Sequence, residues 1–328
     1  MMTPTIFDVI FTISVLFIVG FVVGRAAIIV RTTPKQPIIT AKVLEDSLHP
    51  DTGSRLTTFL ICYPKFIHGD FMTHRAFARN ASSSRAEPSA KRREAIRKHM
   101  AIPVAWGENR PGMQAGAALP AWITVVCQAI WILTGHVALL ASAALDKIGV
   151  HKQVVNRIVE PWSHITVVVT STDEGYANFY ALRDHPDADP TIQVLARRML
   201  EVHADSVPRK LAFGEMHLPF VTDEERRTLP LINQIQISVA RCARTSYNTF
   251  DGVRSLAKDI ALVCRLLDAK PMHASPTEHQ ATAGLPGKRC GCFGPHSGWQ
   301  QYRKTLIGES VRDLAAILDA FRNRKAAA

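Results

Sequence analysis

Two stretches rich in β-branched and apolar residues constrain the fold of this chain most strongly. Residues 40–75 are typical of two strands separated by the turn sequence His-Pro-Asp-Thr-Gly-Ser at 49–54. The run from Ile165 to Val169 is short, continuous and apolar, which is typical of a buried strand. Helical patterns occupy residues 120–145, 188–204, 252–268 and 303–328. The sequence therefore predicts a sheet accompanied by several helices.

The chain has 328 residues and a formal net charge of +11, from 39 Lys and Arg against 28 Asp and Glu. Such a charge attracts anionic ligands. Nucleic-acid binding is the competing use of the charge, and residues 91–99 (KRREAIRKH) favour it locally. However, only 7% of the residues are aromatic, and no nucleic-acid-binding module is recognisable. The sequence therefore favours small anionic ligands and predicts no nucleic-acid partner.

Residues 6–24 form an apolar segment with one acidic residue, Asp8. This length is sufficient to span a bilayer, and the basic residues that follow would keep the rest of the chain in the cytosol. The segment is either a membrane anchor or an extension that the folded domain does not need. The six scattered cysteines show no disulfide framework, which also favours a cytoplasmic location. We divide the chain into residues 1–38, the extension or anchor with its linker, and residues 39–328, a single domain.

A cationic and hydroxyl-rich motif occupies residues 73–85 (THRAFARNASSSR). It combines residues 73–75 (Thr-His-Arg), seven further residues, and residues 83–85 (Ser-Ser-Arg). The guanidinium group of arginine is a planar fork of donors that suits phosphate and carboxylate groups. The small residues let backbone N–H groups approach a phosphate closely. A solvated basic loop is the alternative interpretation.

This motif resembles the signature of the flavin-dependent thymidylate synthases, the ThyX family, which reads R-H-R, seven residues, S-G-R. The resemblance implies that three residues contact the FAD cofactor: His74, Arg75 and Asn80. It implies that four residues bind the substrate dUMP: Arg75, Ser83, Ser84 and Arg85.

A second block, residues 156–183, resembles the same family. The family sequence N-F-x-x-L-R places an Arg against the uracil ring, and Arg183 occupies that position here. Arg157 corresponds to a family Arg that reaches dUMP from a neighbouring subunit, and Asn178 corresponds to a flavin contact. A salt bridge on a helix surface is the alternative role for either arginine.

Four positions depart from the family pattern: Thr73, Ala81, Thr172 and Glu174. Thr73 replaces an Arg and Ala81 replaces a Glu, so one phosphate contact and one carboxylate are missing. Thr172 and Glu174 replace an Asn and an Arg that contact the flavin. These departures imply that the phosphate or adenine end of the flavin is bound by other residues than in the family.

Two further blocks resemble the family but follow the signature instead of preceding it, residues 241–247 (RCARTSY) and 273–279 (HASPTEH). The order predicts a circular permutation, which is tolerated when chain termini lie close together. This mapping adds four residues on the flavin or folate side: Ser246, His273, Ser275 and Glu278. His273 and His279 do not complete a four-ligand set, so no metal site is predicted.

The resemblance implies an α+β fold of the ThyX type, with an antiparallel or mixed sheet, packed helices and a permuted segment order. It implies methylation of dUMP to dTMP, with methylenetetrahydrofolate as the carbon donor, NADPH as the reductant and Arg183 as the catalytic residue. It implies a homotetramer, because family active sites combine several subunits. It also makes residues 120–145 a core helix, with His136 in the core or at an interface.

Two alternatives stay open. The chain can be a non-catalytic relative that binds flavin or nucleotide, which the four departures favour. It can also be a related enzyme that acts on another pyrimidine nucleotide. No Pro-Cys nucleophile motif is present in the sequence, which favours chemistry carried by a flavin.

Overall fold

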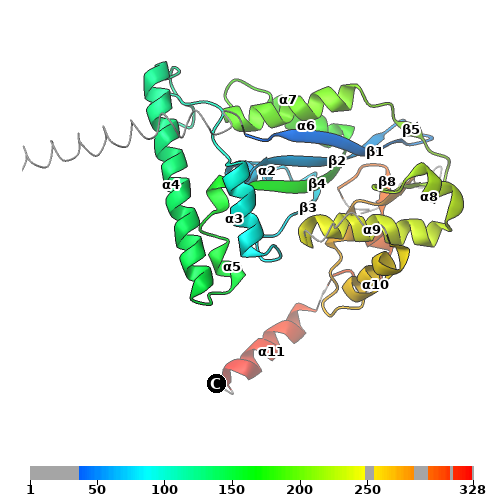
Figure 1. Ribbon diagram of the computed structural model, residues 1–328. Coiled ribbons are helices and arrows are strands. Elements are labelled where there is room, and N and C mark those ends of the chain that lie inside the picture. The colour runs from blue at the N-terminus through cyan, green and yellow to red at the C-terminus, as the bar shows by residue number, and fades with distance from the viewer. Residues whose placement is uncertain (1–36, 248–254, 284–294, 311–312, 327–328) are drawn as a thin grey trace, which may run out of the picture.

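The computed structural model describes residues 37–247, 255–283, 295–310 and 313–326. Strands and helices are mixed along the chain (Figure 1), so the α+β class is confirmed. The strands are β1 (Thr40–Leu48), β2 (Arg55–Pro64), β3 (Ala78–Ala81), β4 (His164–Thr172), β5 (Arg209–Lys210), β6 (Met216–His217), β7 (Ala281–Ala283) and β8 (Trp299–Gln301). The apolar segment 6–24 and the pair Cys290 and Cys292 lie outside the described residues.

The α-helices are α2 (His68–Phe71), α3 (Ser89–Lys98), α4 (Ala121–Lys147), α5 (Lys152–Val155), α6 (Asp173–Arg183), α7 (Pro190–Ala204), α8 (Asp223–Thr228), α9 (Leu231–Tyr247), α10 (Leu256–Leu267) and α11 (Leu314–Ala326). The 3-10 helices are η1 (Lys65–Ile67), η2 (Glu160–Trp162), η3 (Ser275–Glu278) and η4 (Tyr302–Thr305). The helices predicted at 120–145, 188–204 and 252–268 correspond to α4, α7 and α10, with ends that differ by a few residues. The helix predicted at 303–328 begins only at Leu314, because residues 302–305 form the separate 3-10 helix η4. α3 was not predicted.

The main sheet has five strands in the order β3-β4-β2-β1-β5. β1, β2, β4 and β3 pair antiparallel, whereas β5 pairs parallel to β1, so the sheet is mixed as predicted. β6, β7 and β8 form a second, three-stranded sheet. β3 thus brings the end of the signature motif to one edge of the main sheet.

One face of the main sheet carries the principal apolar core. Alternate residues of β2 and β4, among them Phe59, Ile61 and Val167, are fully buried on this face. This follows from the two-residue period of a strand. α6 and α7 cover the face (Figure 1) and contribute six buried side chains: Tyr176, Phe179, Ile192, Leu195, Ala196 and Met199. The core therefore fixes α6, and with it Arg183, against the sheet.

The other face of the sheet is polar and lies under α9 and η3. Thr58 and Thr170 face each other across β2 and β4, with their hydroxyl oxygens 2.6 Å apart. Thr58 Oγ1 lies 2.7 Å from His217 Nε2, and Thr170 Oγ1 lies 2.9 Å from His279 Nδ1. Both histidines are fully buried. Hydroxyl groups of the strands thereby satisfy one ring nitrogen of each histidine.

α3 explains why a charged sequence can lie inside the fold. Arg92 and Arg93 are 4% and 8% exposed. They pair with Glu87 at 2.9 Å and with Asp146 at 2.6 Å, respectively. Two cations of the run 91–99 are therefore unavailable to a nucleic acid. This run was the part of the sequence that most favoured nucleic-acid binding.

α4 differs from the predicted core helix. Among the described residues it alone is long and apolar enough to cross a membrane, by length and composition only, and 28% of its most apolar stretch is buried. A narrow stripe of α4 packs against the rest of the chain. Gly135 lies in this stripe, and because it has no Cβ, the helix can approach Met100 and Trp162 closely. Six large apolar residues are exposed: Trp122, Val125, Ile130, Leu133, Val137 and Leu140. The core assignment is therefore wrong for the chain alone, because only one stripe of an all-round apolar helix finds neighbours; His136 is exposed as well.

Candidate functional site

The first half of the signature motif forms a turn between α2 and β3 that Arg79 holds in place. Arg79 lies on β3 and donates through Nη1 to the carbonyl oxygens of Met72 and His74, both at 3.0 Å. A guanidinium bound to several carbonyls fixes the turn without any regular structure. The family resemblance gives Arg79 no role. The only feature of the sequence that could have pointed to Arg79 is its place inside the motif, two residues after Phe77.

His74 is buried in this turn, and Arg183 reaches it from α6. The His74 ring stacks on Phe77 and meets Phe179 edge-on. Arg183 donates through Nε to His74 Nε2 at 2.9 Å. Burial, followed by the charges of Arg183 and Arg79, lowers the pKa of His74 to about 4. His74 is therefore a neutral imidazole whose Nε2 accepts a hydrogen bond, so its proton is on Nδ1.

Arg183 makes two more contacts with the same turn. Its Nη2 donates to Thr73 Oγ1 at 3.0 Å and to the Asp70 carbonyl at 3.3 Å. Thr73 is a departure from the family signature, and its hydroxyl accepts a bond where an arginine would repel the guanidinium. Arg183 Nη1 makes no hydrogen bond with the described residues, and the side chain is half-buried. One donor edge of Arg183 is therefore open to a ligand.

The late sequence blocks pack against the signature motif, although they lie more than 150 residues away in the chain. Asn80 Nδ2 donates to the Cys242 carbonyl at 3.5 Å, and η3 packs against β3. Glu278 of η3 pairs with Arg303, and burial raises its pKa despite the nearby charges of Arg303, Lys304 and Arg79. The structure therefore brings parts of all three blocks to the β3 edge, and the circular permutation stays a prediction.

The second half of the motif forms a separate polar cluster. Ser84 is buried and its hydroxyl hydrogen-bonds both Lys65 and Glu160. Lys65 Nζ lies 2.6 Å from Glu160 Oε1, and Arg157 Nη1 lies 3.7 Å from the same oxygen. Asn156 Nδ2 donates to the Ser84 carbonyl at 2.8 Å. Ser84 and Arg157, both predicted to bind dUMP, therefore share one carboxylate.

The other predicted site residues are open to solvent. Arg75, Arg85, Asn178, His273 and Ser275 are exposed, and Ser83 is half-buried with its hydroxyl accepting from the Arg85 backbone N–H at 3.3 Å. Ser246 lies in α9, but its side chain is outside the description.

The predicted ligand residues thus divide into two groups. His74, Asn80 and Glu278 are engaged by other groups of the chain, so they hold the backbone around a ligand. Arg183, Arg75 and Asn178 offer donors to a ligand. Such an arrangement suits an anion and can stabilise negative charge that develops on it. Among the described residues, no group of three His, Cys, Asp or Glu side chains can hold a metal ion.

No family model and no curated protein matches this chain. Solved structures with a similar arrangement include two of the UMP/dUMP methylase PolB from Streptomyces cacaoi, one bound with 5-Br dUMP and one with 5-Br UMP. They share 15% and 16% sequence identity with this chain, and each has a TM-score of 0.42. Each match covers 52% of this chain and 92% of the PolB chain.

Proposed function

We propose that this chain methylates a uracil nucleotide, converting dUMP to dTMP as a flavin-dependent thymidylate synthase. The observation that carries the proposal is the bond from Arg183 Nε to His74 Nε2 at 2.9 Å. It joins the two sequence blocks that the family resemblance assigns to the uracil ring and to the flavin. The methyl carbon would come from methylenetetrahydrofolate and the reducing equivalents from NADPH.

Arg183 is the residue that we assign to the pyrimidine. Its Nε and Nη2 are held by His74 and Thr73, so the guanidinium is fixed before a substrate arrives. A fixed cation stabilises charge that develops in the transition state without reorganising. Because His74 is neutral, it positions Arg183 without adding a second positive charge. Arg75, Ser83, Ser84, Arg85 and Arg157 are the residues that would bind the dUMP phosphate.

FAD is the cofactor that this function requires, and when bound it would supply the hydride and carry the one-carbon unit. The exposed donors Arg75, Asn178, His273 and Ser275 suit its phosphates and hydroxyl groups, so these residues fit the cofactor. His74, Asn80 and Glu278 would support the surrounding backbone, because His74 Nε2, Asn80 Nδ2 and a Glu278 carboxylate oxygen already have partners within the chain.

The experiment is tritium release from 5-labelled dUMP, with flavin binding measured in parallel. Arg183→Ala should lower release by about a hundredfold or more while flavin stays bound. Thr73→Val keeps the guanidinium and removes only one of its supports, so release should fall by less than about tenfold. Arg198→Ala, on the exposed surface of α7, is the control. Unchanged release in Arg183→Ala would refute the assignment.

A non-catalytic relative is the second candidate, since three of the predicted flavin contacts are used inside the chain. The same experiment separates the two functions. Binding of dUMP and flavin without any tritium release from the unaltered protein would establish the second candidate. Release with another pyrimidine nucleotide but not with dUMP would identify a related enzyme.

We propose a homotetramer on the basis of α4. The outer face of α4 presents Val137, at 57% exposure, and Leu140, at 71%, to solvent. A surface of this kind marks an association site.

The double variant Val137→Glu/Leu140→Glu tests this assembly. Charges on the apolar face should convert the tetramer to smaller species, measured by light scattering after size-exclusion chromatography. Val207→Glu/Ile307→Glu adds the same charge at two other exposed positions and should leave the mass unchanged. A protein that is monomeric before substitution, or a tetramer that survives it, would contradict the assignment.

A further inference from the structure

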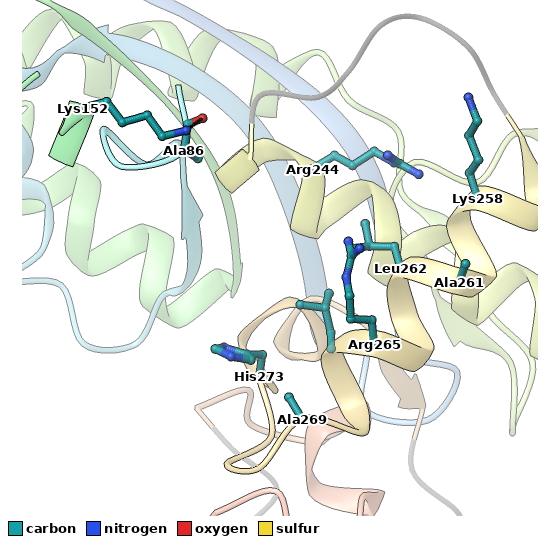
Figure 2. A pocket seen from close by; sticks show the side chains of 10 residues that line it. Ala86, Lys152, Arg244, Lys258, Ala261, Leu262, Arg265, Ala269 and His273 are labelled. Carbon is teal, nitrogen blue, oxygen red and sulfur yellow. Dashed lines mark hydrogen bonds between the residues drawn. The ribbon is translucent and has the colours of Figure 1, made fainter. Parts of the chain in front are cut away.

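A cavity of about 770 Å³ lies between α9, α10 and the loop that follows the signature motif. Figure 2 shows Arg244, Lys258, Arg265 and His273 on the side of the two helices, and Lys152 with Ala86 across from them. The volume falls in the usual range for small-molecule sites. Apart from His273, none of these residues has a role in the function proposed above.

The rim of this cavity carries positive charge, and none of the described residues that line it is an Asp or a Glu. It contains four cations and no carboxylate: Lys152, Arg244, Lys258 and Arg265. Arg244 alone has an acidic partner, Asp259, at 2.7 Å. Asp259 is 3% exposed and also forms an ion pair with Arg241 at 3.5 Å. The negative charge of Asp259 is therefore divided between two arginines. Lys258 and Arg265 are exposed and have no ion-pair partner among the described residues.

The floor of the cavity is apolar. Leu262 and Leu266 of α10 are 8% and 6% exposed and belong to a buried cluster with α9. His273, just beyond α10, adds an exposed aromatic ring. An apolar floor with a few charged groups around it suits a ligand that has both a flat ring and an anionic group.

The wall opposite α10 is fixed by the motif loop. Lys152 Nζ donates to the Ala86 carbonyl at 3.1 Å, and the Ala86 N–H donates to the Ser83 carbonyl at 3.1 Å. Lys152 is thereby held at the rim and is not a freely moving surface lysine. The cation is preorganised, which lowers the entropic cost of binding an anion.

We propose that this cavity binds a nucleoside diphosphate. The diphosphate lies among Lys258, Arg265 and Lys152, and the base lies on Leu262 and Leu266 beside His273. Several cations around one cavity favour a diphosphate over a monophosphate, because each phosphate group gains its own charge-assisted hydrogen bonds. The ligand differs from the uracil monophosphate assigned to Arg183, so this proposal goes beyond the function stated above.

The test is isothermal titration of the full chain with ADP, pyrophosphate and dUMP. The double variant Lys258→Gln/Arg265→Gln should weaken ADP binding by roughly tenfold or more. The control, Lys147→Gln/Arg227→Gln, removes the same charge at two exposed positions outside the cavity and should leave ADP affinity unchanged. ADP should bind more tightly than pyrophosphate, because the base contacts the apolar floor.

Three results would overturn the proposal: no saturable ADP binding, equal losses in the cavity and control variants, or pyrophosphate binding as tightly as ADP. Arg183→Ala keeps this result separate from the proposed function, because it should impair dUMP turnover and leave ADP binding intact. Competition distinguishes two sources of the same chemistry. FAD that does not displace ADP supports a separate nucleotide site, whereas displacement would be a fourth contrary result, because the cavity would then hold the cofactor already proposed.

Discussion

At the scale of single residues, the cluster around Ser84 shows how a ligand position can depend on one carboxylate. Glu160 accepts hydrogen bonds from Lys65 and Ser84 and forms an ion pair with Arg157 at 3.7 Å, and both Lys65 and Glu160 are largely buried. Burial lowers the pKa of Lys65 against the opposing effect of Glu160. The bonds from Lys65 and Ser84 outweigh burial and lower the pKa of Glu160. The position of Ser84 therefore depends on the ion pair between Lys65 and Glu160.

Glu160→Gln should destabilise the protein by about 2 kcal/mol, because it leaves the charge of Lys65 without its partner. The free energy of unfolding by guanidinium chloride measures this. Glu201→Gln removes the partner of Arg198 in a pair that is more than half exposed on both sides, and should cost less than about 1 kcal/mol. Equal costs in the two variants would show that Lys65 does not depend on Glu160.

At the scale of elements, the contact between α6 and the signature turn depends on Gly175. A Cβ on Gly175 would lie 2.1 Å from Ser171 Oγ and 3.2 Å from Ala76 Cβ. A glycine inside a helix usually costs about 1 kcal/mol relative to alanine. Here the missing Cβ lets α6 approach the turn closely enough for Arg183 to reach His74.

Gly175→Ala should therefore destabilise the protein by about 1–3 kcal/mol, although alanine favours a helix. Thermal unfolding measures the loss. In a Ser171→Ala background the cost should be smaller, because the closest atom is absent. A Gly175→Ala variant that is more stable than the unaltered protein would mean that α6 and the turn are not in close contact.

The same elements show which parts of the structure the sequence could predict. β2 and β4 were predictable, because β2 follows a turn sequence and is rich in β-branched and apolar residues, and β4 contains the continuous apolar run from Ile165 to Val169. α3 was not, because its charged residues suggest a solvent-exposed segment, and only Glu87 and Asp146 make it possible to bury Arg92 and Arg93. The bond between His74 and Arg183 joins residues 109 apart, so neither local pattern nor composition could predict it.

At the scale of the whole molecule, several histidines are buried in the neutral form. Burial lowers the pKa of His279 to about 3, and burial followed by the charge of Arg55 lowers the pKa of His203 to about 4. Burial also lowers the pKa of His296 to about 4. An unfolded chain takes up these protons near pH 6.5. The unfolded state therefore binds more protons than the folded state between pH 6.5 and about 4.

Stability should be greatest above pH 6.5 and should fall as the pH drops towards 4, by up to about 1.4 kcal/mol per pH unit for each histidine. Denaturant unfolding at pH 7.5, 6 and 5 measures the slope. His279→Gln should flatten the slope, whereas His136→Gln, at an exposed position, should not. A slope that begins only below pH 4.5 would show that carboxylates, and not these histidines, control acid unfolding.

The strand order also determines how copies of this protein can associate. β3 has four residues and lies against α9 and η3, and β5 at the opposite border has two. β5 pairs only with Ser47 and Leu48, so among the described residues the edge of β1 from Thr40 to Asp46 has no strand partner. A foreign strand could therefore add along β1, whereas α9 and η3 pack against the opposite border. Association of folded copies through the main sheet is thus confined to one of its two borders.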